Sequence, residues 1–84
     1  MLTTQQKALL KEFIDQNIYS VDTYYGYKGD VILRIRTTSE HLVSSVISYC
    51  QQNNIESNTL KNRNLALYEI FIVGKDKDIY SLKN

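Results

Sequence analysis

The side chains that most often carry catalysis are sparse in this chain. Its 84 residues include one histidine, His41, and one cysteine, Cys50. A general base needs a nucleophile or an acid within hydrogen-bond reach, and the sequence offers no recognisable companion for His41. Cys50 falls on an apolar helical stripe, where a free thiol is typical of a small buried side chain. We therefore expect no enzyme, and a hydrolase or nuclease that uses His41 is the least favoured hypothesis.

Metal and cofactor sites are equally hard to build from these residues. One histidine and one cysteine cannot make a tetrahedral zinc site without carboxylates. The stretch Asp76-Lys77-Asp78 lacks the twelve-residue spacing of a calcium loop, and its aspartates suit a turn. The sequence therefore predicts neither a bound metal ion nor a small-molecule cofactor.

Two arginines could bind anions. Arg34 and Arg36 alternate along a predicted strand, so they should project to the same face, and a guanidinium can hold phosphate or carboxylate through two hydrogen bonds. Nearby aromatic rings would offer stacking surfaces for the bases of single-stranded RNA. The formal charge of +1 and the absence of an RNP-like aromatic signature argue against an RNA site. The alternative is a pair of exposed arginines, one of them bridged to Glu69.

The most distinctive local composition is a stretch rich in tyrosine and glycine over residues 24–29. Its tyrosines and its lysine are Tyr24, Tyr25, Tyr27 and Lys28. Tyrosine gives a rigid amphipathic contact at small entropic cost, and glycine lets a loop fit the shape of a partner. The alternative is a hairpin whose tyrosines pair across strands and pack on the rim of the core. We treat the stretch as a candidate binding loop.

Two amphipathic helices must position these residues. Apolar side chains recur with helical spacing over residues 4–17 and again over residues 40–53. Thr3 and Thr37 are each followed three positions later by a glutamine or a glutamate. This spacing is typical of a capping box, in which the two side chains exchange hydrogen bonds with backbone amides at the start of a helix.

Strands are predicted after each helix. Residues 20–25 and 31–36 are rich in β-formers and flank a glycine-bearing loop, which is typical of a β-hairpin. Residues 65–73 give the strongest strand signal, and after a turn residues 79–82 are expected to form a last short strand. Residues 55–61 are either one further strand or an irregular connection. The expected order is α-β-β-α-(β)-β-β, an α+β fold with two helices on one face of a mainly antiparallel sheet.

Two helices can cover only one face of this sheet, so the other face is left to solvent or to a partner. Period-2 alternation places one set of strand residues on that second face, namely Ile32, Arg34, Arg36, Leu67, Glu69 and Phe71. This surface has more apolar area than contact with water alone favours. Together with the tyrosine stretch it gives the candidate partner-binding residues Tyr24, Tyr25, Tyr27, Lys28, Arg34, Arg36 and Phe71.

Composition places the chain among ordinary globular domains. Hydrophobic residues make up 43% and charged residues 23%, and 84 residues leave room for a single domain over 1–84. The lone cysteine and an N-terminus without an apolar signal region favour a cytoplasmic location. The longest apolar stretch, residues 65–73, is about half the length of a membrane span, so no membrane partner is expected.

The chain is short, proline-free and rich in asparagine and tyrosine. In these respects it resembles the small regulators and host-defence inhibitors that bacteriophages encode. The resemblance implies a viral protein that acts on a host or defence factor. The leading hypothesis is a non-enzymatic protein-binding module that could also dimerise by burying Leu67 and Phe71. The alternative is a small RNA-binding protein that uses the same face.

Overall fold

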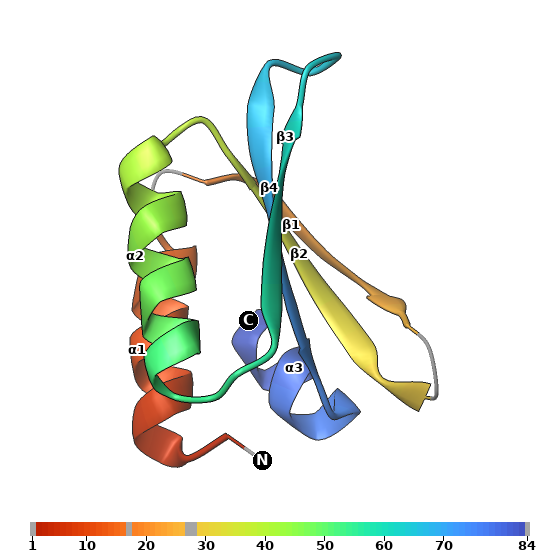
Figure 1. The fold of residues 1–84 in the computed structure, drawn as a ribbon. Coiled ribbons are helices and arrows are strands. Elements are labelled where there is room, and N and C mark those ends of the chain that lie inside the picture. Colours follow the sequence, from red (N-terminus) through yellow and green to blue (C-terminus); the bar gives the residue numbers. More distant parts are fainter. Residues whose placement is uncertain (1, 17, 27–28, 84) are drawn as a thin grey trace.

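The computed structural model of the chain describes residues 2–16, 18–26 and 29–83 (Figure 1). Its elements are α1 (Thr4–Ile14), β1 (Ile18–Tyr25), β2 (Val31–Thr37), α2 (Glu40–Gln52), β3 (Ser57–Asn62), β4 (Leu67–Gly74) and α3 (Asp76–Lys83). The strands form one antiparallel sheet in the order β1-β2-β4-β3. The predicted α+β class is confirmed, and the uncertain segment over residues 55–61 contains a strand.

Helix α1 begins as the capping box predicts, and α2 does not. The backbone N–H of Gln6 donates to Thr3 Oγ1 at 3.1 Å, and the N–H of Thr3 donates to Gln6 Oε1 at 3.0 Å. Helix α2 begins after Ser39, whose hydroxyl accepts from the N–H of Leu42 at 3.1 Å. The predicted cap, Thr37, is still part of β2, where it pairs with Tyr68 of β4, and its hydroxyl accepts the N–H of Ser39 at 3.1 Å.

The last strand predicted over residues 79–82 is wrong, because these residues lie in α3. Ile79 and Leu82 are three positions apart and both fully buried, which is the spacing of one helix face. Gly74 gives α3 room against the end of β4, since a Cβ at this position would lie 3.1 Å from Ile79 Cδ1. The molecule therefore has a third helix where the sequence predicted a strand.

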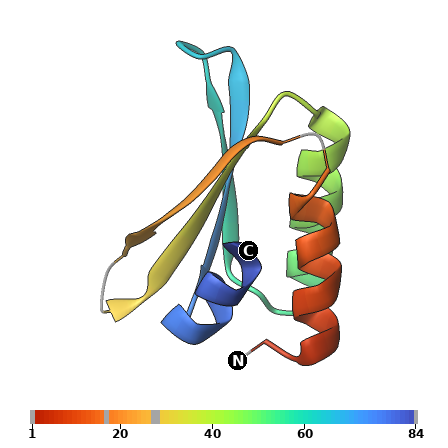
Figure 2. The same cartoon turned by 180° about the vertical axis from the view of Figure 1, so that it is seen from behind.

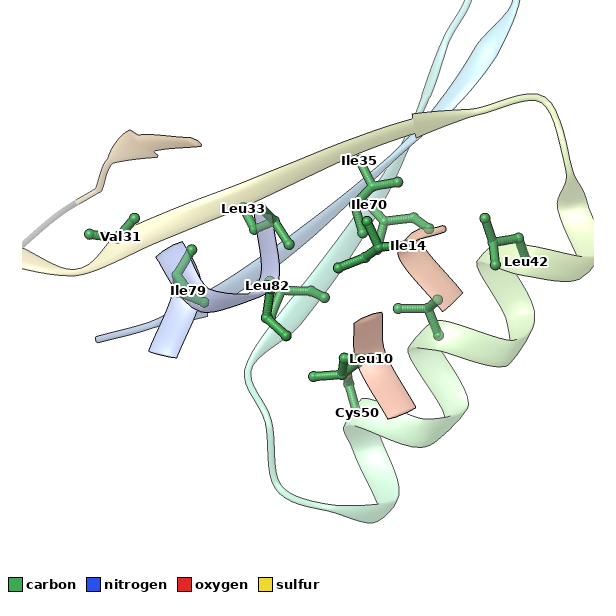
Figure 3. Packing of buried hydrophobic residues seen from close by; sticks show 12 residues of the cluster. Leu10, Ile14, Val31, Leu33, Ile35, Leu42, Cys50, Ile70, Ile79 and Leu82 are labelled. Atoms are coloured by element: carbon green, nitrogen blue, oxygen red, sulfur yellow. The ribbon is translucent and has the colours of Figure 1, made fainter. Parts of the chain in front are cut away.

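All three helices lie on one face of the sheet (Figures 1 and 2). Helix α2 packs against β3 and β4, α3 packs against β1 and β2, and α1 packs against the other two helices. The predicted alternation is confirmed on this covered face, where Leu33, Ile35 and Ile70 are fully buried. They meet side chains from the three helices in one cluster that includes Leu10, Ile79 and Leu82 (Figure 3).

Candidate functional site

The face of the sheet opposite the helices, which we call the uncovered face, is organised by the strand registers. Two rows of side chains cross all four strands: Asp22, Arg34, Phe71 and Asn58 in one row, and Ser20, Arg36, Glu69 and Leu60 in the next. Tyr24, Ile32 and Val73 form a third row across β1, β2 and β4. This face brings together four of the predicted site residues.

Arg34 is held by two residues of the neighbouring strand β1. Its Nε donates to Asp22 Oδ1 at 3.0 Å, and its Nη2 donates to Asp22 Oδ2 at 2.6 Å. The hydrogen bond to this carboxylate raises the pKa of Arg34. The guanidinium carbon also lies 5.5 Å from the centre of the Tyr24 ring, within cation–π range. Arg34 is thus neutralised and oriented by two residues of β1.

Arg36 is neutralised by a carboxylate on the opposite neighbour strand. Its Nε donates to Glu69 Oε2 at 2.7 Å, as the ion-pair alternative expects. The Glu69 side chain is 6% exposed, and Leu67 is 3% exposed as a residue. The expectation that both lie open to solvent is therefore wrong. Strand β4 is an inner strand, and Glu69 lies between Arg36 of β2 and Leu60 of β3, whose long side chains flank a residue that alternation alone assigns to the surface.

Apolar and aromatic side chains stay accessible beside these ion pairs. Leu60 is 55% exposed, Tyr24 is 40% exposed, and Phe71 is half-buried between Arg34 and Asn58. Leu60 comes from the edge strand β3, and Tyr24 comes from the opposite edge strand β1. The uncovered face therefore combines fixed charges with open apolar contacts.

Among the described residues of the tyrosine stretch, Tyr24 and Tyr25 lie on opposite faces of the sheet. Tyr24 pairs with Ile32 on the uncovered face, whereas Tyr25 pairs with Val31, whose side chain lies beneath the helices. Tyr25 is 75% exposed at the end of β1, on the helix side of the sheet. Tyr27 and Lys28 lie outside the described residues. This separation follows from strand geometry, because adjacent side chains in a strand point to opposite faces.

Asp22 and Leu60 are among the residues of the uncovered face that were missed in the sequence. Asp22 is found once the hairpin register is known, because the pairing of Tyr25 with Val31 also places Asp22 opposite Arg34. Leu60 was missed because the segment that contains it gave no clear strand signal. Period-2 alternation applied to β1, as it was applied to β2, would have identified Asp22.

The two residues considered for catalysis lie apart from the uncovered face. His41 is exposed in the first turn of α2. Cys50 is fully buried on α2, and burial raises the pKa of its thiol while a hydrogen bond with Ser57 lowers it in part. The interpretation of Cys50 as a core residue is confirmed.

A pocket of about 340 Å³ opens where α1 begins and where α2 and β4 end. Asp78 in its lining accepts the backbone N–H of Leu2 at 3.0 Å and lies 3.4 Å from the Lys7 ammonium. The hydrogen bond from Leu2 lowers the pKa of Asp78. These contacts tie the first residues of the chain to α3, which gives Asp78 a structural role.

The described part of the chain holds no group of three or more histidine, cysteine, aspartate or glutamate side chains placed to bind a metal ion. Among its helices, none is long and apolar enough to cross a membrane. Comparison with known proteins found no matching family model, no matching curated protein and no matching solved structure. The interpretation of the uncovered face rests on its own geometry.

Proposed function

We propose that the chain is a small non-enzymatic protein-binding module that regulates or inhibits its partner through the uncovered face. One observation carries the proposal: both arginines of this face are neutralised within the chain, while apolar side chains beside them stay accessible. A binding surface of this kind gains affinity from apolar and aromatic contacts rather than from net charge. Tyr24, Leu60 and Phe71 are the proposed contact residues.

Preorganisation supports the choice of this surface. Arg34 is held by two hydrogen bonds and an aromatic ring, and Arg36 is held by a nearly buried carboxylate. A partner would therefore meet side chains that have already lost much of their conformational freedom, and binding would cost correspondingly less entropy. Arginine and tyrosine are also enriched among the residues that dominate the energy of protein interfaces.

RNA binding by the same face is the alternative. The ring of Tyr24 and the two arginines are the groups that such a site would use. Phosphate oxygens would have to compete with Asp22 for Arg34 and with Glu69 for Arg36. This competition makes a protein partner the better-supported proposal.

A reducing compartment is part of the proposal, and the cytoplasm is the one we favour. The only cysteine of the chain, Cys50, is buried in the core, where its protonated thiol packs as an apolar group. Small secreted domains commonly rely on several disulfides, which this sequence cannot form.

The test is capture of a partner from host lysate on the immobilised chain, with and without nuclease. Tyr24→Ala removes an aromatic contact of the uncovered face, and Tyr25→Ala is the matched control because its side chain lies on the other side of the sheet. We expect a nuclease-resistant protein whose affinity falls about tenfold or more for Tyr24→Ala and is unchanged for Tyr25→Ala. Equal affinities of the two variants would contradict the proposal, and capture that nuclease abolishes would indicate RNA.

A further inference from the structure

Strand β3 forms one edge of the sheet and pairs with β4 on its other side. All six of its residues are exposed or half-buried, and its register with β4 runs from Ser57 to Asn62 without a break. We propose that β3 pairs antiparallel with β3 of a second copy of this chain, which joins the two sheets into one. This inference does not rest on the proposed function, because its hydrogen bonds come from the backbone at the edge of the sheet; of the proposed contact residues it touches only Leu60.

The backbone of β3 offers a regular row of hydrogen-bonding groups. The N–H of Val73 donates to the carbonyl of Glu56 at 2.9 Å, so Glu56 directs its backbone groups toward β4. In an antiparallel ladder, alternate residues direct these groups to opposite sides of the strand. The N–H and C=O groups of Ser57, Thr59 and Lys61 therefore point outward, away from β4.

A two-fold axis midway between Thr59 of the two copies gives each of these outward N–H and C=O groups a hydrogen-bond partner. Thr59 then pairs with Thr59 of the second copy, and Ser57 of each chain pairs with Lys61 of the other. Each of these pairs exchanges two hydrogen bonds, so every outward group of the three residues gains a partner.

The side chains also suit this register. Threonine opposite threonine is a favourable cross-strand pair, and Lys61 meets a serine instead of another lysine. Leu60 would lie diagonally from the second copy's Leu60, within side-chain reach at about 7–8 Å. Pairing therefore covers part of Leu60, which is 55% exposed in the single chain.

The opposite edge of the sheet is less suited to pairing. Strand β1 has a bulge between Ile18 and Ser20, where its register with β2 shifts. Bulges at sheet edges twist the strand and interrupt its row of hydrogen-bonding groups, which disfavours pairing with another chain. The regular edge of β3 has no such break, so self-association should use β3.

Joining the sheets through β3 would keep all helices on one side of the dimer. A two-fold axis perpendicular to the sheet maps each face onto itself, so the two uncovered faces become one continuous surface. A small domain also gains burial from such an assembly, because it buries a smaller share of its surface than a larger one does.

Sedimentation velocity from low to high micromolar concentration tests the pairing. We expect the mass to rise from 9.8 kDa to twice that value. Thr59→Pro removes an outward N–H at the two-fold axis, a group that the backbone pairing with β4 does not use. It also removes the hydroxyl that donates to the carbonyl of Glu69 on β4 at 3.1 Å, so Thr59→Val, which lacks this hydroxyl but keeps the N–H, is measured beside it and should dimerise like the unmodified chain. The variant should fold, as circular dichroism would show, and should dimerise about tenfold or more weakly.

Thr23→Pro is the matched control, because Thr23 occupies the equivalent outward position on β1. The N–H of Gly26 donates to the carbonyl of Asp30 at 2.8 Å, so alternation directs the backbone groups of Thr23 away from β2. We expect this variant to dimerise like the unmodified chain. A dimer that Thr59→Pro leaves intact, or that Thr23→Pro disrupts equally, would overturn the pairing.

Amide hydrogen exchange gives a second measurement that needs no variant. The amides of Ser57, Thr59 and Lys61 should become more protected as the concentration rises, whereas the amide of Thr23 should not. A mass that stays at 9.8 kDa at high micromolar concentration, or exchange that is independent of concentration, would overturn the inference. Partner capture by Thr59→Pro separates the two proposals, since a variant that no longer dimerises should still bind through its uncovered face.

Discussion

On strand β2, Leu33 and Ile35 are fully buried beneath the helices, whereas Arg34 and Arg36 are half-buried on the uncovered face. The first two are held by apolar contact, which depends on the area removed from water and has little directionality. The arginines are held by hydrogen bonds to carboxylates of neighbouring strands, which fix both distance and direction. One strand thus supports the fold on one side and a preorganised surface on the other.

The two ion pairs of the uncovered face also differ from each other. Asp22 sits on an edge strand with its side chain 44% exposed, whereas Glu69 sits on an inner strand with its side chain 6% exposed. An exposed pair contributes little to stability, but a buried carboxylate that loses its partner is costly. We therefore expect Arg34 to serve binding and Arg36 to serve both binding and stability.

The largest expected effect separates the two faces directly. Leu33→Ala leaves a cavity beneath the helices and should lower the free energy of unfolding by about 2–5 kcal/mol. Ile32→Ala is the matched control from the uncovered face, and it should cost clearly less because Ile32 is only half-buried. Chemical denaturation measures both variants. Equal losses would show that the uncovered face carries as much of the fold as the covered face.

The next effect distinguishes the two arginines. Arg36→Ala leaves the Glu69 carboxylate nearly buried and unpaired, so it should cost about 1–3 kcal/mol of unfolding free energy. Arg34→Ala removes one partner of Asp22, whose side chain is already 44% exposed, and should cost about 0–1 kcal/mol. Chemical denaturation at neutral pH compares them. The distinction between an inner and an edge ion pair fails if the two variants lose equal stability.

A carboxylate on the helix side should make stability depend on pH. The pKa of Asp78 is lowered because it accepts the N–H of Leu2 and faces Lys7. A lowered folded-state pKa means that the contribution is complete above the ordinary value of about 3.9 and is lost as the pH falls through the folded-state value. The stability difference between the unmodified chain and Asp78→Asn should therefore shrink below about pH 4. A difference that is constant with pH would refute the charge contribution of Asp78.

The smallest expected effect is on the hydrogen bond between Tyr68 of β4 and Glu40 of α2. The Tyr68 hydroxyl donates to Glu40 Oε1, and this hydrogen bond raises the pKa of Tyr68. The small stabilisation that accompanies it should be present below the ordinary tyrosine value of about 10 and lost as the pH rises through the raised value. Glu40→Gln should lower the pKa of Tyr68, followed by tyrosinate absorbance with Tyr68→Phe as the assignment control. An unchanged titration in Glu40→Gln would contradict this role for Glu40.

Local patterns predicted the covered face well. Alternation along β2 and β4 and the helical stripe that includes Leu10 were enough to identify most of the buried side chains. Residues 79–82 were misassigned because they contain β-formers in a short segment, and their helical state depends on packing against the sheet beyond Gly74. Propensity in a short segment is a weak guide when tertiary contacts decide the conformation.

The uncovered face was predicted only in part, because its properties depend on neighbouring strands. Alternation placed Glu69 on this face but could not show that an inner strand buries it. The partner of Arg34 required the hairpin register, which aligns Asp22 with it. Tyr25 was grouped with Tyr24 by composition, although strand geometry directs the two rings to opposite sides.

The most direct test of the central claim is methyl NMR of the chain titrated with its captured protein partner. Each face offers methyl probes: Ile32, Leu60 and Val73 on the uncovered face, and Leu33 and Ile35 beneath the helices. We expect the partner to shift or broaden the first three signals and to leave the other two unchanged. If the partner shifts or broadens only methyl signals of the helices and leaves Ile32, Leu60 and Val73 unchanged, the account is contradicted.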